Sequence, residues 1–505
     1  MTPIFDASQI RYITPEILLT LCAFLVLGLS TVRDTGTRRW APMLSILSCV
    51  MTLVAVLSYP WSVGLDWLRA PESATSVFNG MFILDAFAIS FKVIFLVSAI
   101  LTIMISHRYL EIERANAGEY YALMLFAVVG MMFMASAGDF IAIFVSLETM
   151  AISFYILVGF MKSNRKSNEA ALKYFLLGSF STGILLYGIS LVYGMTGTTN
   201  LARIGMSGAA AAINSDQAPF FLLGVILITV GFGFKIAAVP FHMWAPDAYE
   251  GAPTPITAFL STASKAAAFV VLVRVFATAF IQIGDRWAPL LALLAVASMS
   301  LGNIAAILQD NIKRMLAYSS ISHAGYVLMG LIAVGVGTSD EARDFGLTSI
   351  ILYLFIFLFV NIGAFALVVM LRRGHVVGDR LVDFAGLARR APFAAFAMLI
   401  FMLSLAGIPA TAGFVGKWYL FGAAIKADYT WLAVVAVVNS AISLYYYARV
   451  VVMMYVKEPA DDARLAPSLG QRLAIAACIT FTLVFGIYPE PIVSLAQRSI
   501  LALAP

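Results

Sequence analysis

Long apolar runs separated by short polar loops fill the chain from one end to the other. The runs are about 20 to 30 residues long, which is the length that an α-helix needs to cross a bilayer. They lack the alternating pattern of an outer-membrane β-barrel, so helices are the predicted spanning structure. The run centres fall near residues 22, 50, 93, 128, 150, 183, 228, 268, 298, 325, 360, 405, 440 and 480. The pattern therefore predicts an all-α polytopic membrane protein with about fourteen transmembrane helices.

Composition supports this fold class and excludes an ordinary soluble domain. Of the 505 residues, 62% are hydrophobic and only 12% are charged. The longest polar stretches, around residues 195–217, 374–391 and 457–471, are too short to form a folded domain of their own. We therefore expect all recognition to take place in the membrane or beside it.

The distribution of charge indicates the orientation of the chain. The net charge is +5, but the basic residues are divided between alternate loops rather than gathered in one patch, so nucleic acid is not an expected partner. Loops after odd-numbered helices hold the larger set, among them Lys166, Arg314 and Arg390. The opposite loops, with both termini, hold the smaller set, among them Arg203 and Arg498. The positive-inside rule then places the odd loops in the cytoplasm and both termini on the outer side.

The first residues, MTPIFDASQIRYITPEILL, have no basic segment and no cleavage site typical of a signal peptide, so we expect them in the mature protein.

The order of the helices indicates a possible internal repeat. Helices one to three cover residues 1–118, helices four to eight cover 119–285, helices nine to thirteen cover 286–456, and helix fourteen covers 457–505. Two consecutive units of five helices must have inverted topologies, because five is odd. The fourth helix of each unit contains Gly/Pro-rich sequence, GFGFKIAAVP and AGIPATAGFVGK, which predicts a broken helix in each unit. Ordinary proline kinks are the alternative interpretation.

Four ionisable side chains lie deep inside these spans: Glu148, Lys235, Lys265 and Lys417. An intramembrane ionisable residue is a functional-site hypothesis by default. Counted from the starts of their helices, Glu148 and Lys265 lie roughly 13 to 15 Å deep, near the bilayer midplane, and Lys417 is similarly deep. Burial disfavours the charged form of a lysine, which can then bind and release a proton at cellular pH. Movement of Glu148 toward or away from Lys235 would load or unload that proton, whereas a static ion pair is the alternative.

Two histidines lie in distinct settings. His323 belongs to NIKRMLAYSSISHAGY, where Ser319, Ser320, Ser322 and Tyr326 surround it with hydroxyl groups. Histidine titrates near neutrality, and hydroxyls with water can bridge lysines that are too far apart for direct transfer, so a relay role and a structural role both stay open. His242 belongs to PFHMWAPDAYEGAPTPITA, whose prolines predict a rigid loop. One His with two carboxylates is too weak a signal for a metal site.

Several other charged residues within or beside spans have different expected roles. Lys173 follows Glu169 by four residues, in the favourable order for an ion pair at the start of a span. Arg274 and Arg449 are expected to extend from helix ends toward the membrane surface. Lys92 has no recognisable context.

Motifs for bound cofactors are absent from the sequence. There is no phosphate-binding G-x-x-x-x-G-K-[ST] loop, no dinucleotide fingerprint and no Cys cluster for iron–sulfur or haem ligation. Cys22, Cys49 and Cys478 lie in predicted spans and are expected to be small core residues. The chain is therefore expected to bind no cofactor itself and to take its energy from an ion gradient or a partner.

Four segments carry a specific family resemblance. They are EAALKYFLLGSFSTGILLYGISLVYGMTG (169–197), GFGFKIAAVPFHMWAPDAYEGAPTP (231–255), NIKRMLAYSSISHAGY (311–326) and LSLAGIPATAGFVGKWYLF (403–421). The chain resembles the antiporter-like membrane subunits of respiratory complex I, which are related to the large subunits of multisubunit cation/proton antiporters. Lysine at position 417, and no long amphipathic helix after helix fourteen, favour the subunit N branch of that family. Ala410 departs from the Pro-Pro expected after Gly-Ile-Pro, which affects the expected local helix geometry.

The resemblance implies a proton-translocating role within a redox enzyme of the bacterial inner membrane. Matched position by position, the fifth-helix glutamate is Glu148 and the seventh-, eighth- and twelfth-helix lysines are Lys235, Lys265 and Lys417, with His323 as a further relay candidate. It also implies two inverted five-helix repeats, other membrane-arm subunits and the bilayer as partners, and NADH, FMN, iron–sulfur clusters and quinone in the parent complex. A subunit of a secondary cation/proton antiporter is the second hypothesis, and a membrane scaffold with structural charges is the third.

Overall fold

The computed structural model describes residues 7–31, 35–62, 74–115, 117–214, 216, 218–372, 378–459, 465 and 467–500. Within these residues, thirteen helices are long and apolar enough to cross a membrane. Each contains one of the centres predicted from the sequence. The remaining centre, near residue 405, falls on two shorter helices, α18 (Pro392–Ala406) and α19 (Ala412–Lys426). The predicted all-α polytopic fold is confirmed.

The N-terminal part contains the first three spans and a small hairpin that the apolar pattern did not predict. Its elements are η1 (Ala7–Ile13), α1 (Thr14–Ser30), α2 (Thr35–Leu57), α3 (Tyr59–Ser62), β1 (Thr75–Val77), β2 (Phe82–Leu84) and α4 (Ala86–Glu113). The two strands pair antiparallel, with Val77 opposite Phe82. Asp85 follows the hairpin directly, and its side chain accepts a hydrogen bond from the Ala88 amide, which caps α4.

The middle of the chain contains the next five spans. Its elements are α5 (Ala117–Ser136), α6 (Phe140–Val158), α7 (Arg165–Thr196), α8 (Leu201–Arg203), η2 (Ile204–Gly208), α9 (Ala209–Ile213), α10 (Ala218–Lys235), α11 (Trp244–Gly251), α12 (Thr254–Phe259), η3 (Leu260–Ser264), α13 (Lys265–Arg274), η4 (Val275–Ala279) and η5 (Ile281–Ile283). Asp139 caps α6, the helix that carries Glu148, by accepting a hydrogen bond from the Ile141 amide. The π-helical turns η3 and η4 flank α13, and such turns are frequent at functional sites.

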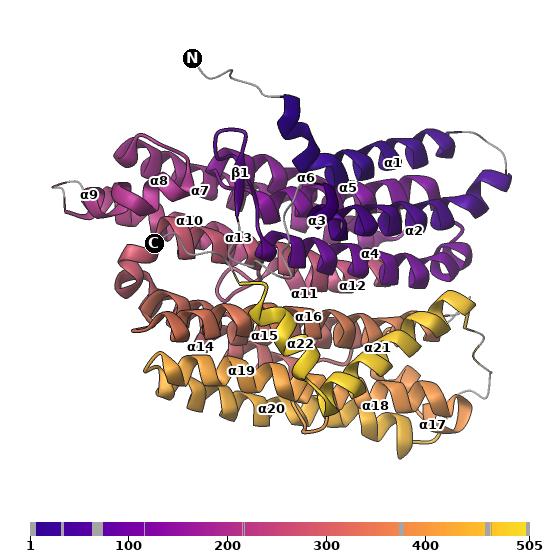
Figure 1. Cartoon of the computed structure of the whole chain (residues 1–505). Helices are drawn as coiled ribbons and strands as arrows, with labels where there is room; N and C mark the ends of the chain where they lie inside the picture. The colour runs from indigo at the N-terminus through magenta and orange to yellow at the C-terminus, as the bar shows by residue number, and fades with distance from the viewer. Residues whose placement is uncertain are drawn as a thin grey trace.

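The last part of the chain contains the remaining spans. Its elements are α14 (Gly284–Ile307), α15 (Ile312–Val336), α16 (Asp340–Leu371), η6 (Leu381–Phe384), α17 (Leu387–Arg390), α18, α19, α20 (Thr430–Tyr455), α21 (Leu469–Ile487) and α22 (Glu490–Gln497). The short helix α22 crosses the front of the molecule in Figure 1, between α16 and α21.

The spans run side by side, with the N-terminal helices at the top of Figure 1 and α18 to α20 at the bottom. The most deeply buried spans are the continuous helical segment Thr254–Ala279, α15 and α16, whereas α1 and α20 leave much of their surface exposed. Helix α15 packs against α14, α16 and α19. Lys265 and His323 therefore lie on helices that the rest of the chain encloses.

Both predicted helix breaks are present. Helix α10 ends at Lys235, and the chain resumes as α11 after a turn, so the predicted rigid loop contains a short helix. The second break separates α18 from α19. Each break contains an alanine in the left-handed region, Ala237 with φ 59° and Ala410 with φ 66°. At the second break, Gly407 with φ 86° follows α18 directly and ends it, because a left-handed residue cannot continue the hydrogen-bond ladder.

Candidate functional site

Lys265 occupies the first position of α13, directly after the π-helical turn η3. Its ammonium group is buried and donates two hydrogen bonds to Ser320 on α15, at 2.6 Å to the backbone oxygen and 2.5 Å to the hydroxyl oxygen. Lys265 therefore contacts the hydroxyl-rich segment of α15 directly. A hydroxyl at this position can accept a proton from the ammonium and donate its own onward.

His323 lies three residues after Ser320 and is held between two tyrosines. Its Nδ1 forms a hydrogen bond with the Tyr353 hydroxyl on α16, and its Nε2 lies 3.1 Å from the Tyr447 hydroxyl on α20. The Tyr447 hydroxyl also lies 2.5 Å from the hydroxyl of Ser319. Either atom of the Ser319–Tyr447 pair can be the donor. These buried groups form an unbroken hydrogen-bonded run from Ser319 to Tyr353.

Lys417 lies at the second helix break. Its ammonium donates to the Ala406 carbonyl, the last residue of α18, and to the Ser440 hydroxyl on α20, each at 2.9 Å. The carbonyl end of a helix carries partial negative charge, so this half-helix provides a natural site for a cation. The Tyr326 ring centroid is 5.1 Å from the ammonium.

Gly407 leaves the space that this geometry needs. It has φ +86°, and a Cβ atom there would lie 2.8 Å from Cδ and 3.3 Å from Nζ of Lys417. Glycine is therefore required both by the backbone conformation and by the close approach of the lysine.

Glu148 and Lys235 lie in the first half of the chain. The Glu148 carboxylate accepts a hydrogen bond from Thr182 on α7 at 2.9 Å. The Lys235 ammonium is buried, lies 5.9 Å from the Tyr155 ring centroid, and has no hydrogen-bond partner among the described residues. The described part of the chain therefore shows no direct contact between the Lys235 ammonium and the Glu148 carboxylate.

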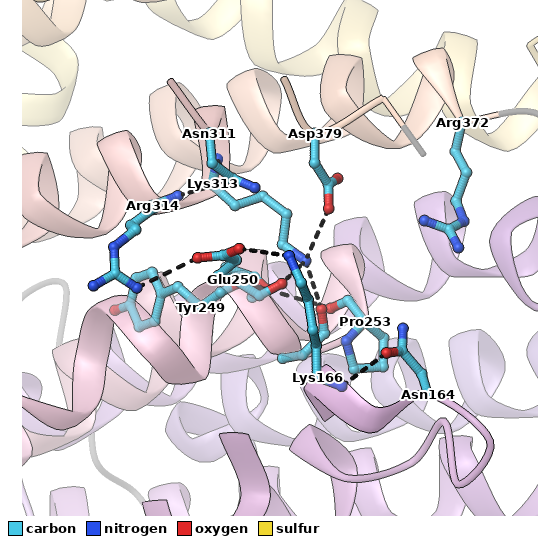
Figure 2. Close-up of polar contacts among 12 residues, drawn as sticks. Asn164, Lys166, Tyr249, Glu250, Pro253, Asn311, Lys313, Arg314, Arg372 and Asp379 are labelled. Atoms are coloured by element: carbon cyan, nitrogen blue, oxygen red, sulfur yellow. Dashed lines mark hydrogen bonds and ion pairs between the residues drawn. The ribbon is translucent and has the colours of Figure 1, made fainter. Parts of the chain in front are cut away.

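A network of ion pairs fixes α11, the helix that follows the first break. Asp247 accepts hydrogen bonds from Lys173 at 2.8 Å and from Arg314 at 2.6 Å. Glu250 accepts from Lys166 at 2.9 Å and more weakly from Arg314 at 3.3 Å. Figure 2 shows Glu250 between the cations of α7 and α15. The network therefore ties α11 to two long helices.

The charges of this network determine the protonation of the two carboxylates. Burial alone would raise the pKa of Asp247, but the hydrogen bonds from Lys173 and Arg314 outweigh burial and hold that pKa below its ordinary value. At Glu250, burial also raises the pKa, but Lys166 and Arg314 lower it by more, so this pKa too lies below its ordinary value. Both groups are therefore charged at neutral pH.

Lys313 anchors the end of the same short helix. Its buried ammonium donates to the backbone oxygens of Glu250 and Ala252, each at 2.7 Å, and lies 3.9 Å from the Asp379 carboxylate (Figure 2). The last carbonyls of a helix have no partner within the helix, so this lysine satisfies them.

The structure corrects the prediction for Arg274 and supplies a context for Lys92. Arg274 does not extend to the membrane surface, because it is buried and forms a two-pronged pair with Asp85 at 3.0 Å for each contact. Lys92 lies 2.7 Å from Glu16 on α1, and both side chains are fully buried. Each of these pairs joins α4 to another helix. The sequence did not reveal them because the partners lie in distant spans.

One predicted ion pair is present, and Arg449 has contacts that the sequence did not predict. The Lys173–Glu169 ion pair measures 2.8 Å, as the spacing predicts. Arg449 reaches from near the end of α20 to Asp310, to the carbonyl of Ile307 at the end of α14, and to the carbonyl of Gln309 in the loop before α15. The three cysteines are free, and the described residues contain no cluster of His, Cys, Asp and Glu that could hold a metal ion.

The structure therefore joins some predicted site residues and leaves others apart. Lys265 contacts the α15 segment that carries His323, whereas Glu148 and Lys235 have no hydrogen bond to it. Thr182, Tyr353, Ser440 and Tyr447 were not predicted from the sequence. Their signal was a hydroxyl group inside an apolar span, but such hydroxyls are common, and those of serine and threonine often bond the carbonyl one turn earlier.

The chain is similar to membrane subunits of two kinds of complex. Residues 137–443 match the family described as NADH:quinone oxidoreductase/Mrp antiporter, TM. NADH-quinone oxidoreductase subunit N 2 of Solibacter usitatus is 45% identical over 500 residues, which cover 98% of each chain. A chain in respiratory complex I from Thermus thermophilus with bound aureothin is 30% identical, with a TM-score of 0.78 over 95% of this chain and 98% of that chain. A chain of the Mrp complex from Dietzia sp. DQ12-45-1b shares the fold, with a TM-score of 0.80, 23% identity and 96% of each chain covered.

The chain therefore belongs to the family of NADH:quinone oxidoreductase and Mrp antiporter membrane subunits. Within this family it belongs with subunit N of bacterial NADH-quinone oxidoreductase, as the lysine at position 417 predicted. It is a multi-pass subunit of this enzyme complex in the bacterial inner membrane, and other membrane-arm subunits are its partners.

Proposed function

We propose that the chain translocates protons along the buried groups Glu148, Lys235, Lys265, His323 and Lys417, coupled to electron transfer from NADH to quinone in other subunits. The hydrogen-bonded run on α15 is the observation that carries this proposal. Lys265 contacts Ser320, and the adjacent Ser319 begins the run through Tyr447 to His323.

Each group in this run can both receive and pass on a proton. A serine or tyrosine hydroxyl donates one hydrogen bond and accepts others, and a neutral imidazole has one donor and one acceptor nitrogen. A proton that arrives at one nitrogen of His323 can therefore leave from the other after the hydrogen bonds reverse. Water can complete the step toward Lys417 where no direct hydrogen bond exists.

Glu148 would control when Lys235, in the first half of the chain, binds and releases its proton. The ammonium form of a buried lysine is costly, and a nearby carboxylate stabilises it. Approach of Glu148 would favour protonated Lys235, and withdrawal would favour release. The absence of a direct pair in this structure is consistent with the released arrangement.

The proposal includes the remaining sequence expectations about the assembly. The two broken helices support an inverted repeat over residues 119–285 and 286–456, with Lys235 and Lys417 at corresponding breaks. Odd loops would face the cytoplasm and both termini the outer side. The terminal residues 1–6 and 501–505 lie outside the described residues.

Substitution of Lys265 tests the relay. In complex I reconstituted into proteoliposomes, Lys265→Met should lower proton pumping at least about tenfold and slow the coupled quinone reduction, because positioned proton donors typically contribute that much or more. Lys162→Met, at an exposed loop lysine, is the control. Normal pumping by fully assembled Lys265→Met complex would refute the role of Lys265.

The sequence also left open a subunit of a cation/proton antiporter, and the Mrp chain shares the fold, but the relationship to subunit N favours the redox complex. Purification from the native membrane distinguishes the two. Copurification with flavin and iron–sulfur subunits supports the redox pump, whereas the isolated chain should show no flavin, haem or iron–sulfur absorbance. Stoichiometric flavin on the single chain would contradict the expectation that it binds no cofactor.

A further inference from the structure

An apolar pocket of about 170 Å³ is lined by none of the residues of the proposed proton path. It is formed where α2, α4 and α16 meet the short helix α22, and its lining includes Leu57, Ile94, Ile351, Phe355, Ile492 and Ala496. The lining is almost entirely hydrocarbon. Apolar cavities of this size exclude water and bind apolar molecules.

The pocket reaches the exposed surface of the chain near the end of α2. Leu57, the last residue of α2, lines it and is 44% exposed. Ser90 and Ser499 also line it and share a hydrogen bond of 2.6 Å, one turn from the start of α4. Ile94 lies a further turn along α4, so the pocket extends roughly 12 Å inward from the start of that helix. Its direction therefore follows the span, as an acyl chain does.

A cationic residue is next in the chain to Ser499, which lines this pocket. Arg498 follows α22 directly and is adjacent to Ser499. Its guanidinium is exposed and makes no ion pair or hydrogen bond with the other residues that the structure describes, although the Arg498 amide bonds to Ser494. A guanidinium is well suited to bind a phosphate, often through two parallel hydrogen bonds.

We propose that this pocket binds one acyl chain of a membrane phospholipid, whose phosphate contacts Arg498. The apolar lining selects a hydrocarbon chain, the opening gives access from the bilayer, and the free guanidinium favours a phosphate headgroup over an uncharged quinone ring. The bound chain fills the space between α4, α16 and α22, and so joins the N-terminal spans to the second half of the subunit.

Photo-crosslinking of intact complex I in nanodiscs tests the proposal. The probe is a phosphatidylglycerol with a diazirine near the middle of one acyl chain, and labelled peptides are identified by mass spectrometry. Adducts should form on α4, α16 and α22. Ala496→Phe should reduce them about tenfold, because overpacking of a filled site costs that much affinity. Arg498→Gln should reduce them about threefold, since its contact is exposed.

Arg203→Gln is the matched control, because Arg203 is also exposed and belongs to the same set of predicted outer-side cations. It should leave the adducts unchanged. If Ala496→Phe prevents assembly, the adduct yield of Arg498→Gln tests the proposal instead, because an exposed side chain is not needed for packing. The proposal is overturned if no adducts form on the pocket residues, if Arg498→Gln leaves them unchanged, or if a quinone with a diazirine tail labels them while the lipid does not.

Discussion

The lysines at the two helix breaks, Lys235 and Lys417, differ in the hydrogen-bond acceptors that surround their ammonium groups. At the second break, the Lys417 ammonium is held by the Ala406 carbonyl and the Ser440 hydroxyl. At the first break, the Lys235 ammonium has no hydrogen-bond partner among the described residues, and Tyr155 presents only a ring. The Phe234 carbonyl near this break is already bonded by the Trp244 indole at 2.8 Å.

This difference indicates distinct roles for two residues that look equivalent in sequence. Fixed acceptors stabilise the charged form of Lys417 without help from another ionised side chain. The charge on Lys235 instead depends on Glu148 and on any water that enters. Lys235 is therefore expected to respond to a neighbouring charge, and Lys417 to local backbone geometry.

The largest expected effect is at Lys235. Lys235→Met should reduce proton pumping and coupled quinone reduction at least about tenfold with assembly intact. Lys235→Arg should fail to restore full pumping, because arginine does not release its proton. The measurement is pumping by reconstituted complex at matched expression, and near-normal rates would remove Lys235 from the path.

Loss of the Glu148 charge should lower the proton-pumping rate by a similar factor. Glu148→Gln keeps the shape but removes the charge that stabilises protonated Lys235. In a double-mutant cycle on pumping rates, Glu148→Gln with Lys235→Met should be less than additive, whereas Glu148→Gln with Lys417→Met should be nearly additive. Strict additivity in the first pair would show that the two residues act independently.

A smaller effect is expected from Gly407→Ala, which tests the geometry of the second break. The new methyl group would collide with Lys417 and strain a left-handed residue, so pumping should fall by roughly fivefold. Gly183→Ala on α7 is the control, because nothing lies within 4 Å of a Cβ atom at that position. Equal pumping by the two variants would argue against a requirement for the fixed Lys417 contacts.

The smallest expected effect is on the stability of α11, the short helix that follows the first break and is held by the ion pairs of Asp247 and Glu250. The pKa values of Asp247 and Glu250 are lowered in the folded protein. Their ion pairs therefore stabilise α11 fully above the ordinary carboxyl pKa of about 4. This stabilisation is lost as the pH falls through the lowered pKa values and the carboxylates become protonated. Amide exchange over 244–251, corrected for its intrinsic pH dependence, should be constant from about pH 5 to 8 and rise below about pH 4. Asp247→Asn should raise this exchange already at pH 7, whereas Asp285→Asn, at an exposed carboxylate, should not. Equal exchange in both variants would contradict a bracing role.

The sequence predicted the spans well because lipid imposes a strong length and hydropathy requirement on each one. It also identified Lys235 and Lys417 beside breaks, because Gly and Pro mark irregular helix. It could not predict Asp85–Arg274 or Glu16–Lys92, since these pairs depend on how distant spans pack. The hydrogen bonds of His323 were equally inaccessible, because they come from tyrosines on α16 and α20.

Replacement of Tyr447 tests the central claim most directly. Tyr447→Phe removes the hydroxyl that joins Ser319 to His323 but keeps the packed ring, and Tyr445→Phe on the exposed side of α20 is the matched control. The measurement is the number of protons pumped per NADH oxidised by reconstituted complex, together with the pumping rate. We expect Tyr447→Phe to lower the rate roughly tenfold while Tyr445→Phe leaves it unchanged. An unchanged rate and stoichiometry in Tyr447→Phe would contradict proton transfer through this run.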